Sequence, residues 1–191
     1  MKRRRARVAF VLLLLGALAA APIRAEEVEE KEPSLLATLL WERGLLLHAL
    51  GQYELAVGHF RKSIEVRPTA EAHTYLGWSL SKLGRLEEAI GECKKAMALD
   101  PEFGNPYNDI GVYLIELGRP NEAIPYLEKA IRAKRYCCYQ FAHFNMGRAL
   151  YLRGELAEAR RSFKRALEVD PDYAPAREAL RALREQGYRD L

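Results

Sequence analysis

The stretch YLGWSLSKLGRLEEAIGECKKAMALDP, residues 75–101, decides the fold. It reads as two helices that separate near Gly84, yet Gly77 lies inside the first helix, where glycine costs about 1 kcal/mol relative to alanine. A helix keeps such a residue only where something offsets that cost. We interpret Gly77 as a packing notch, a point without a side chain at which a second helix can approach closely.

The same pattern occurs four times along the chain. Its mid-helix glycines are 33, 34 and 36 residues apart, and each copy has a second glycine seven residues later and an alanine five beyond that. These positions are Gly44, Gly77, Gly111 and Gly147, then Gly51, Gly84, Gly118 and Gly154, then Ala56, Ala89, Ala123 and Ala159. So many coincident positions predict an array of helical hairpins. We expect the second glycine to end the first helix with a positive φ, and the alanine to oppose the notch.

The Leu-Gly, Leu-Gly, Ala and Pro positions of this pattern resemble the tetratricopeptide repeat over residues 37–173. The resemblance implies an all-α fold, a right-handed superhelical solenoid of four helical hairpins with a concave face. The repeats would occupy 37–69, 70–103, 104–139 and 140–173, followed by a capping helix and tail at 174–191. Apolar residues on one face of 175–186 and charges on the other suit the solvated end of such an array.

The N-terminus MKRRRARVAFVLLLLGALAAAPIRA, residues 1–25, has a basic start, an apolar run of 14 residues and then small residues. This is typical of a secretory signal peptide, and we expect cleavage near Ala25. The alternative is an uncleaved membrane anchor, but 14 helical residues rise only about 21 Å, against about 30 Å of hydrocarbon. We therefore expect an exported chain, periplasmic or secreted, with no stable membrane span after cleavage and with residues 26–36 as an acidic linker.

The net charge of +4 does not indicate a polyanion partner. Six basic residues lie within residues 1–25, and removing them from the 30 Lys and Arg leaves 24, against 26 Asp and Glu. A nucleic-acid surface needs a local excess of basic residues, so we expect no nucleic-acid binding. The sequence also shows no nucleophile elbow, phosphate loop or metal-ligand motif, so we expect no enzyme activity, cofactor or metal.

The junction AKRYCCYQF, residues 133–141, is longer than its counterparts and has Arg135 where they have proline. Its adjacent Cys137 and Cys138 could form a strained vicinal disulfide, bind a metal weakly, pair with another chain, or pack as small apolar residues beneath the neighbouring tyrosines. We favour packing, because a metal would need a further His or Cys at ligand spacing. Cys93 falls on a helix face that we expect to be buried.

The family geometry implies a groove lined by the first helix of each hairpin and used to bind a protein or peptide segment. The residues expected to bind are Trp41, Trp78, Asn108, Val112, Ile115, Phe144, Arg148 and Tyr151. The apolar members would be costly on a bare surface, so we expect them to contact a partner, with Asn108 and Arg148 fixing its register. Two alternatives stay open: closure of the superhelix over these residues, and a structural module that forms a homo-oligomer.

A narrower resemblance concerns NPYNDIGVYLIELGRPNEAIPYLEKAI, residues 105–131, and the longer junction that follows it. Both are similar to the third repeat of the type IV pilus pilotin family. That family implies a helper in the assembly of secretin subunits, a cell-envelope complex. The apolar N-terminal run is not followed by the lipidation cysteine of that family, which puts outer-membrane anchoring in doubt.

Overall fold

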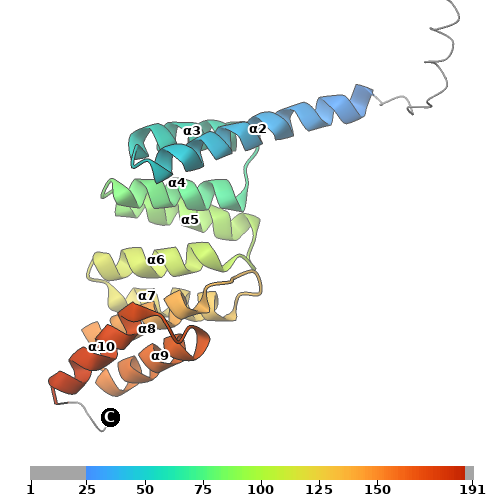
Figure 1. The fold of residues 1–191 in the computed structure, drawn as a ribbon. Helices are drawn as coiled ribbons and strands as arrows, with labels where there is room; N and C mark the ends of the chain where they lie inside the picture. Colours follow the sequence, from blue (N-terminus) through green and yellow to red (C-terminus); the bar gives the residue numbers. More distant parts are fainter. Residues whose placement is uncertain (1–24, 188–191) are drawn as a thin grey trace, which may run out of the picture.

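The computed structural model describes residues 25–187. The elements in this range are α2 (Ala25–Ala49), α3 (Tyr53–Val66), α4 (Ala70–Lys82), α5 (Leu86–Leu99), α6 (Gly104–Glu116), α7 (Pro120–Arg132), α8 (Tyr139–Leu152), α9 (Leu156–Val169) and α10 (Ala174–Glu185). Successive helices pair as hairpins that stack along one axis, and α10 lies against the last hairpin (Figure 1). This is the all-α solenoid of four hairpins with a terminal helix that the repeat pattern predicts.

The N-terminal segment behaves differently from the expected linker. Residues 26–36 belong to α2, which begins at Ala25 and projects beyond α3 in Figure 1. Glutamate has a high helix propensity and is favoured near a helix N-terminus by the helix dipole, so a helix anchored by packing on α3 can continue through this acidic stretch. The predicted signal peptide, apart from Ala25, lies outside the described residues. Within residues 25–187, no helix has both the length and the apolar character needed to cross a bilayer.

The mid-helix glycines lie where the two helices of a hairpin come closest. A Cβ at Gly111 would stand 2.5 Å from Cδ2 of Leu127, and a Cβ at Gly44 would stand 2.6 Å from Cε1 of Phe60. Each notch thus receives the side chain sixteen residues later, which is large in three of the four hairpins. The expected alanines are fully buried. At Gly77 the alanine opposes the notch as predicted, because a Cβ there would stand 3.1 Å from the carbonyl oxygen of Ala89 and 3.0 Å from Sγ of Cys93; in the other three hairpins the nearest neighbour is the later residue. The four neighbours are Phe60, Cys93, Leu127 and Phe163.

The first helix of each hairpin ends just before a glycine with a positive φ. The angles are 73°, 75°, 71° and 80° at Gly51, Gly84, Gly118 and Gly154. After α4, the backbone N–H of Arg85 donates to the carbonyl of Leu80 at 3.0 Å and satisfies one of the last free carbonyls of the helix. A side chain would strain this left-handed conformation, so the predicted glycine caps are confirmed.

The buried side chains of the described residues form a main cluster and two smaller ones. One cluster of buried side chains runs from Leu47 in α2 to Met146 in α8 and includes Cys93, which is fully buried as expected. A second cluster packs Leu180 and Leu183 of α10 on Phe163 of α9. The terminal helix therefore covers an apolar surface that the fourth hairpin would otherwise expose.

The longer junction between α7 and α8 packs on the turn that precedes α6. Gly104 N–H donates to the Arg135 carbonyl at 3.1 Å, and Arg135 N–H donates to the Glu102 carbonyl at 3.0 Å. A Cβ at Gly104 would overlap the Cβ and ring of Tyr136, so this glycine makes the close approach feasible. The junction thus places the Tyr136 ring at the side of the solenoid where the first helices lie.

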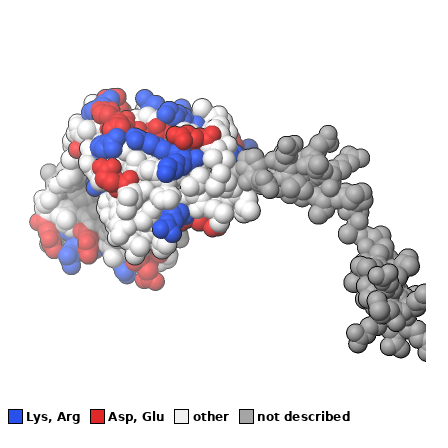
Figure 2. Space-filling view, turned by 90° about the horizontal axis from the view of Figure 1, so that it is seen from above, with Lys and Arg blue, Asp and Glu red and all other residues white. Residues whose placement is uncertain are grey.

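The surface charges of the described residues pair locally. Figure 2 looks down on the α2–α3 end of the stack and shows basic and acidic side chains interspersed on that face. Elsewhere among the described residues, Arg85 pairs with Glu88 at 2.6 Å and Arg119 with Glu122 at 2.7 Å. Exposed pairs of this kind add little stability. The face shown in Figure 2 has no broad field of one sign.

Candidate binding groove

The first helices of the hairpins line a groove with a volume of about 630 Å³. Side chains from α2, α4, α6 and α8 form it, together with residues of the α7–α8 junction and of the turn before α10. Nine of its eighteen lining residues are aromatic: Trp41, Tyr75, Trp78, Phe103, Tyr113, Tyr136, Phe141, Phe144 and Tyr173. Half of the aromatic residues of the whole chain, and both of its tryptophans, are therefore gathered on one surface.

Most of the residues predicted to bind lie together. Six of the eight line this groove, namely Trp41, Trp78, Asn108, Val112, Phe144 and Arg148. Ile115 and Tyr151 instead line an adjacent pocket of about 400 Å³ between α8 and α10, which shares Phe144 and Arg148 with the groove. Ile115 is only 6% exposed, because it packs into the core between hairpins, so the expectation of an exposed side chain there was wrong. Trp78 is 43% exposed, so the described helices do not close over the groove.

The aromatic walls hold one another in place. Trp41 meets Tyr75 edge to face with ring centroids 5.8 Å apart, and Tyr75 lies 5.7 Å from Trp78. At the other end, the ring of Phe144 lies edge to face with Tyr173 at 5.4 Å. Ring pairs at these separations attract each other beyond simple burial, so the walls are formed before any ligand arrives.

A line of polar side chains crosses the groove from α8 to α6. Arg148 donates to the amide oxygen of Asn145 at 3.1 Å, Asn145 donates to Asn108 at 3.0 Å, and Asn108 donates to the carboxylate of Asp109 at 3.3 Å. Both asparagines are buried, and Asp109 is half-buried. The line thus directs its donors toward one acid at the centre of the groove.

Asp109 and Asn145 were not among the predicted residues. They occupy equivalent places, two residues before the mid-helix glycines Gly111 and Gly147, and this repeat position is not one that faces the groove in the family geometry. A signal was available, because a buried helix position next to a notch rarely carries a polar side chain without a purpose. Asp109 and Asn145 hold this position in the third and fourth copies, and this repetition could have indicated the row of hydrogen-bonded side chains.

The electrostatics of the groove centre on Asp109. Burial raises the pKa of its carboxyl to about 7, although the hydrogen bond from Asn108 opposes the shift. Burial and the charge of Asp109 together raise the pKa values of the Tyr113 and Tyr136 hydroxyls. Neither hydroxyl has a hydrogen-bond partner of normal geometry within residues 25–187. The centre of the groove therefore holds one acid and two phenol oxygens that the protein leaves largely unsatisfied.

The junction cysteines lie beside this centre. Cys138 lines the groove and packs near Tyr136 and Tyr139, as the packing interpretation expected, whereas Cys137 is exposed. The two thiols are free in the structure, and burial raises the pKa of Cys138 to about 11. Within residues 25–187, no three His, Cys, Asp or Glu side chains gather in a way that could hold a metal ion.

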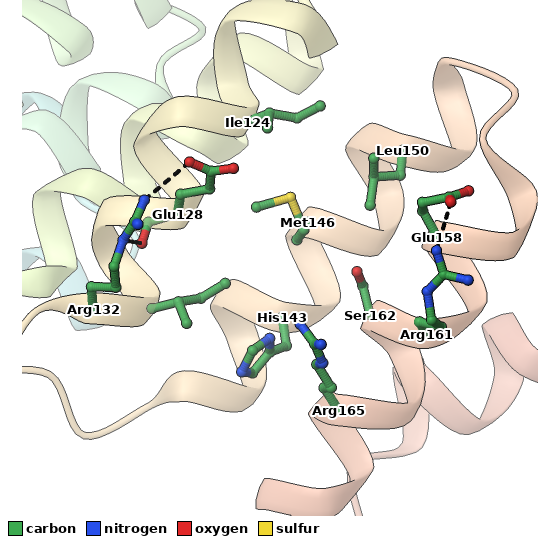
Figure 3. A pocket seen from close by; sticks show the side chains of 11 residues that line it. Ile124, Glu128, Arg132, His143, Met146, Leu150, Glu158, Arg161, Ser162 and Arg165 are labelled. Carbon is green, nitrogen blue, oxygen red and sulfur yellow. Dashed lines mark hydrogen bonds and ion pairs between the residues drawn. The ribbon is translucent and has the colours of Figure 1, made fainter.

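A second cavity of about 430 Å³ lies among α7, α8 and α9 and does not share residues with the groove. Figure 3 shows its acids paired with bases of their own helices, Glu128 with Arg132 at 3.0 Å and Glu158 with Arg161 at 2.6 Å. Burial lowers the pKa of His143 at its edge, which favours the neutral ring. Both acids of this cavity are thus paired with a base, unlike Asp109 in the groove.

Comparison with known proteins identifies the repeats. Family models described as tetratricopeptide repeat match residues 35–100, 105–137 and 140–173. The chain belongs to the tetratricopeptide repeat family. Among curated relatives of this repeat protein, the small glutamine-rich tetratricopeptide repeat-containing protein 2 of Mycosarcoma maydis is 30% identical over 80 residues. The match covers 41% of this chain and 23% of that protein, so it spans about a quarter of the relative's length.

Solved structures share the solenoid. Pseudomonas aeruginosa PilF superposes with a TM-score of 0.76 at 23% identity, covering 81% of this chain and 70% of that one. PilW, described as a type IV pilus biogenesis factor, gives 0.73 at 21% identity with coverages of 80% and 70%. YrrB, described as having an unusual peptide-binding site, gives 0.63 at 25% identity with coverages of 86% and 84%. The likeness to PilF and PilW agrees in fold with the narrower resemblance to pilus proteins.

Proposed function

We propose that this chain is a non-enzymatic scaffold that binds a segment of a partner protein in its groove. The observation that carries the proposal is the aromatic surface that continues over the first helices of all four hairpins and stays open at Trp78. Aromatic rings each bury a large apolar area and dominate binding energetics at protein interfaces. A concave, largely apolar surface with a few convergent polar groups is the usual form of a binding site.

The arrangement of the groove suits a peptide segment. Apolar side chains of the segment would pack on the rings, while its main-chain amides would meet the buried asparagines Asn108 and Asn145. Stacked helical repeats expose such extended concave surfaces as a consequence of their geometry. The described peptide-binding site of YrrB supports the same use of the fold here.

A comparison of two variants tests this proposal. Trp78→Ala removes a groove ring, whereas Leu55→Ala removes an apolar side chain of similar exposure on α3 that lines none of these cavities. Capped peptides selected from a random library on the wild-type chain should bind Trp78→Ala at least about tenfold more weakly and Leu55→Ala equally well. Circular dichroism should show the same helicity for all three chains. Selected peptides that bind both variants alike would dismiss the groove.

We further propose that the scaffold is exported and assists assembly of a cell-envelope complex. The signal-peptide pattern of residues 1–25 supports export, and the fold shared with the pilus biogenesis factor PilW supports the envelope role. N-terminal sequencing of the chain recovered from a secreting host should read from Glu26. A chain that keeps its first residues and stays in the cytoplasm would overturn the export proposal.

Self-association is a second candidate function, and α2 favours it. Leu35, Leu39 and Leu46 are 61%, 54% and 55% exposed and lie four and seven residues apart, so they share one face of the helix. Among the described residues, no earlier hairpin covers this face. Light scattering of residues 26–191 should show a dimer that Leu39→Glu dissociates. A monomer at every concentration would exclude this candidate.

A further inference from the structure

We propose that the centre of the groove receives a basic side chain, a lysine or arginine of the bound protein segment, which pairs with Asp109 among the aromatic rings. This proposal rests on the proposed function and specifies the chemistry of the partner. It follows from three features of the groove: an acid that pairs with no cation of the described residues, buried tyrosine hydroxyls beside that acid, and aromatic rings around them.

Asp109 has fewer partners than an ionised carboxylate requires. Its two oxygens can accept about four hydrogen bonds, yet it receives one, from Asn108, and makes no ion pair within residues 25–187. Glu71, the other acid that lines the groove, already has a cation, because it forms an ion pair with Arg135 at 2.8 Å. Asp109 is therefore the acid that a cation from outside can complete.

No cation of residues 34–187 pairs with Asp109. The groups that face Asp109 are Tyr113 on its own helix, Cys93 from α5 and Tyr136 from the α7–α8 junction, and all are neutral. Arg148 of α8 lines the same groove, but its guanidinium donates to Asn145. The pKa of Asp109 is raised by burial and lowered by the hydrogen bond from Asn108, and no positive charge contributes to the shift. The negative charge of Asp109 is thus left uncompensated in the free protein.

The surroundings of Asp109 accept hydrogen bonds and offer ring faces. The Tyr136 hydroxyl has no hydrogen-bond partner among the described residues, and that of Tyr113 interacts only with Ser81; both oxygens are buried, so they can accept a bond only from a group that enters the groove fully. Aromatic faces attract cations, more strongly where water is excluded. A neutral apolar side chain would leave all these oxygens unsatisfied, and an acidic one would face Asp109 as a like charge. A basic side chain brings both the positive charge and the hydrogen-bond donors that Asp109 lacks.

The proposal has a consequence for protons. Near neutral pH part of the Asp109 population is protonated, since burial raises its pKa to about 7. A bound cation favours the ionised carboxylate, so binding releases protons and strengthens as the pH rises from about 6 to about 8. A neutral ligand lacks this dependence.

A pair of small probes tests the inference directly. Nα-acetyl-lysine methylamide and its neutral counterpart Nα-acetyl-norleucine methylamide differ only in the charged end. Trp41 and Trp78, the two tryptophans of the chain, both line the groove, so their fluorescence reports binding. At about pH 8 the lysine probe should bind wild type at least about tenfold more tightly than the norleucine probe.

Two variants decide the cause of that preference. Asp109→Asn keeps the shape of the side chain and should bring the ratio of the two affinities close to one. Glu71→Gln changes an acid of the same groove that already has a partner, and it should keep the preference. Equal affinities for both probes on the wild type, or a preference that survives Asp109→Asn, would overturn the inference.

The peptide selection separates this proposal from the proposed function. Peptides that depend on Trp78 and are enriched in lysine or arginine support both. Peptides that depend on Trp78 without such enrichment keep the groove as a binding site and overturn the basic side chain. The absence of any peptide that depends on Trp78 overturns both.

Discussion

Replacing Gly111 with alanine tests whether the mid-helix glycines are packing notches. A Cβ at this position would stand 2.5 Å from Cδ2 and 2.6 Å from Cγ of Leu127. Leu127 is fully buried, and its Cγ is a branch point near the backbone, so it cannot turn away into solvent. Gly91, inside α5, is the matched control, because a Cβ there would meet nothing within 4 Å.

The two substitutions should change stability in opposite directions. Helix propensity alone stabilises either alanine by about 1 kcal/mol. Inserting a methyl group into a packed core costs about 1–3 kcal/mol, and a contact this short places Gly111→Ala at the upper end of that range. We therefore expect Gly111→Ala to lose about 2 kcal/mol and Gly91→Ala to gain about 1 kcal/mol. At about 2–4 °C per kcal/mol, the Tm should fall by about 4–8 °C in the first variant and rise by about 2–4 °C in the second.

Thermal unfolding followed by circular dichroism measures both changes, and urea unfolding checks that the dependence on denaturant stays the same. Both residues are glycines inside helices, so both alanine substitutions gain the same helix propensity. The difference between the two variants therefore measures the contact with Leu127 alone. Equal increases in Tm would show that the space beside Gly111 is open. That result would refute the packing explanation of the repeat.

Further consequences can be measured on single substitutions. Gly104→Ala should lower the Tm and shift the NMR signals of the α7–α8 junction, because the new methyl group overlaps Tyr136; an unperturbed junction would contradict this packing. Asp109→Asn should stabilise the free chain by about 1–2 kcal/mol at about pH 8 and by much less at about pH 4. Because the pKa of Asp109 is raised on folding, the wild type loses stability as the pH rises from about 4 to about 7. For a fully buried carboxyl this loss would be about 4 kcal/mol, and the partial exposure of Asp109 reduces it by solvent screening. The same gain at both pH values would contradict an uncompensated charge. Exposed Cys137 should react with an alkylating reagent in the native chain, whereas Cys93, fully buried and with a raised pKa, should react only after unfolding; mass spectrometry that finds both labelled together would disagree.

The hairpin array could be predicted from the sequence because its requirements are local. A positive φ after the first helix, as at Gly84, and a close helix contact, as at Gly77, are each met best by glycine, so the spacing of glycines records the spacing of hairpins. The lining of the groove was an implication of the resemblance to the tetratricopeptide repeat. Six of the eight residues predicted to bind line the groove.

The remaining features depend on contacts between distant segments. Whether α2 continues through the acidic stretch depends on packing with α3 as well as on propensity. Ile115 is buried because it belongs to one core cluster with Met146 and Ala149 of the next hairpin, a contact that one repeat cannot reveal. The place of Tyr136 depends on backbone pairing between Arg135 and Gly104, two residues in different repeats.

The proposed specificity of the groove depends on one repeat position that differs between copies of the same scaffold. The residue two before each notch glycine is Glu42, Tyr75, Asp109 and Asn145 in successive copies. In the third copy this position holds Asp109. In the fourth copy it holds Asn145, whose amide donates to Asn108, and Asn108 in turn donates to Asp109. A half-buried acid without a cation destabilises the chain, but the stability of a repeat array is roughly a sum over units and their interfaces, so the other hairpins can offset one unfavourable residue. An acid that costs stability in the free chain and gains a partner only on binding is a direct way to make a uniform scaffold select one kind of ligand.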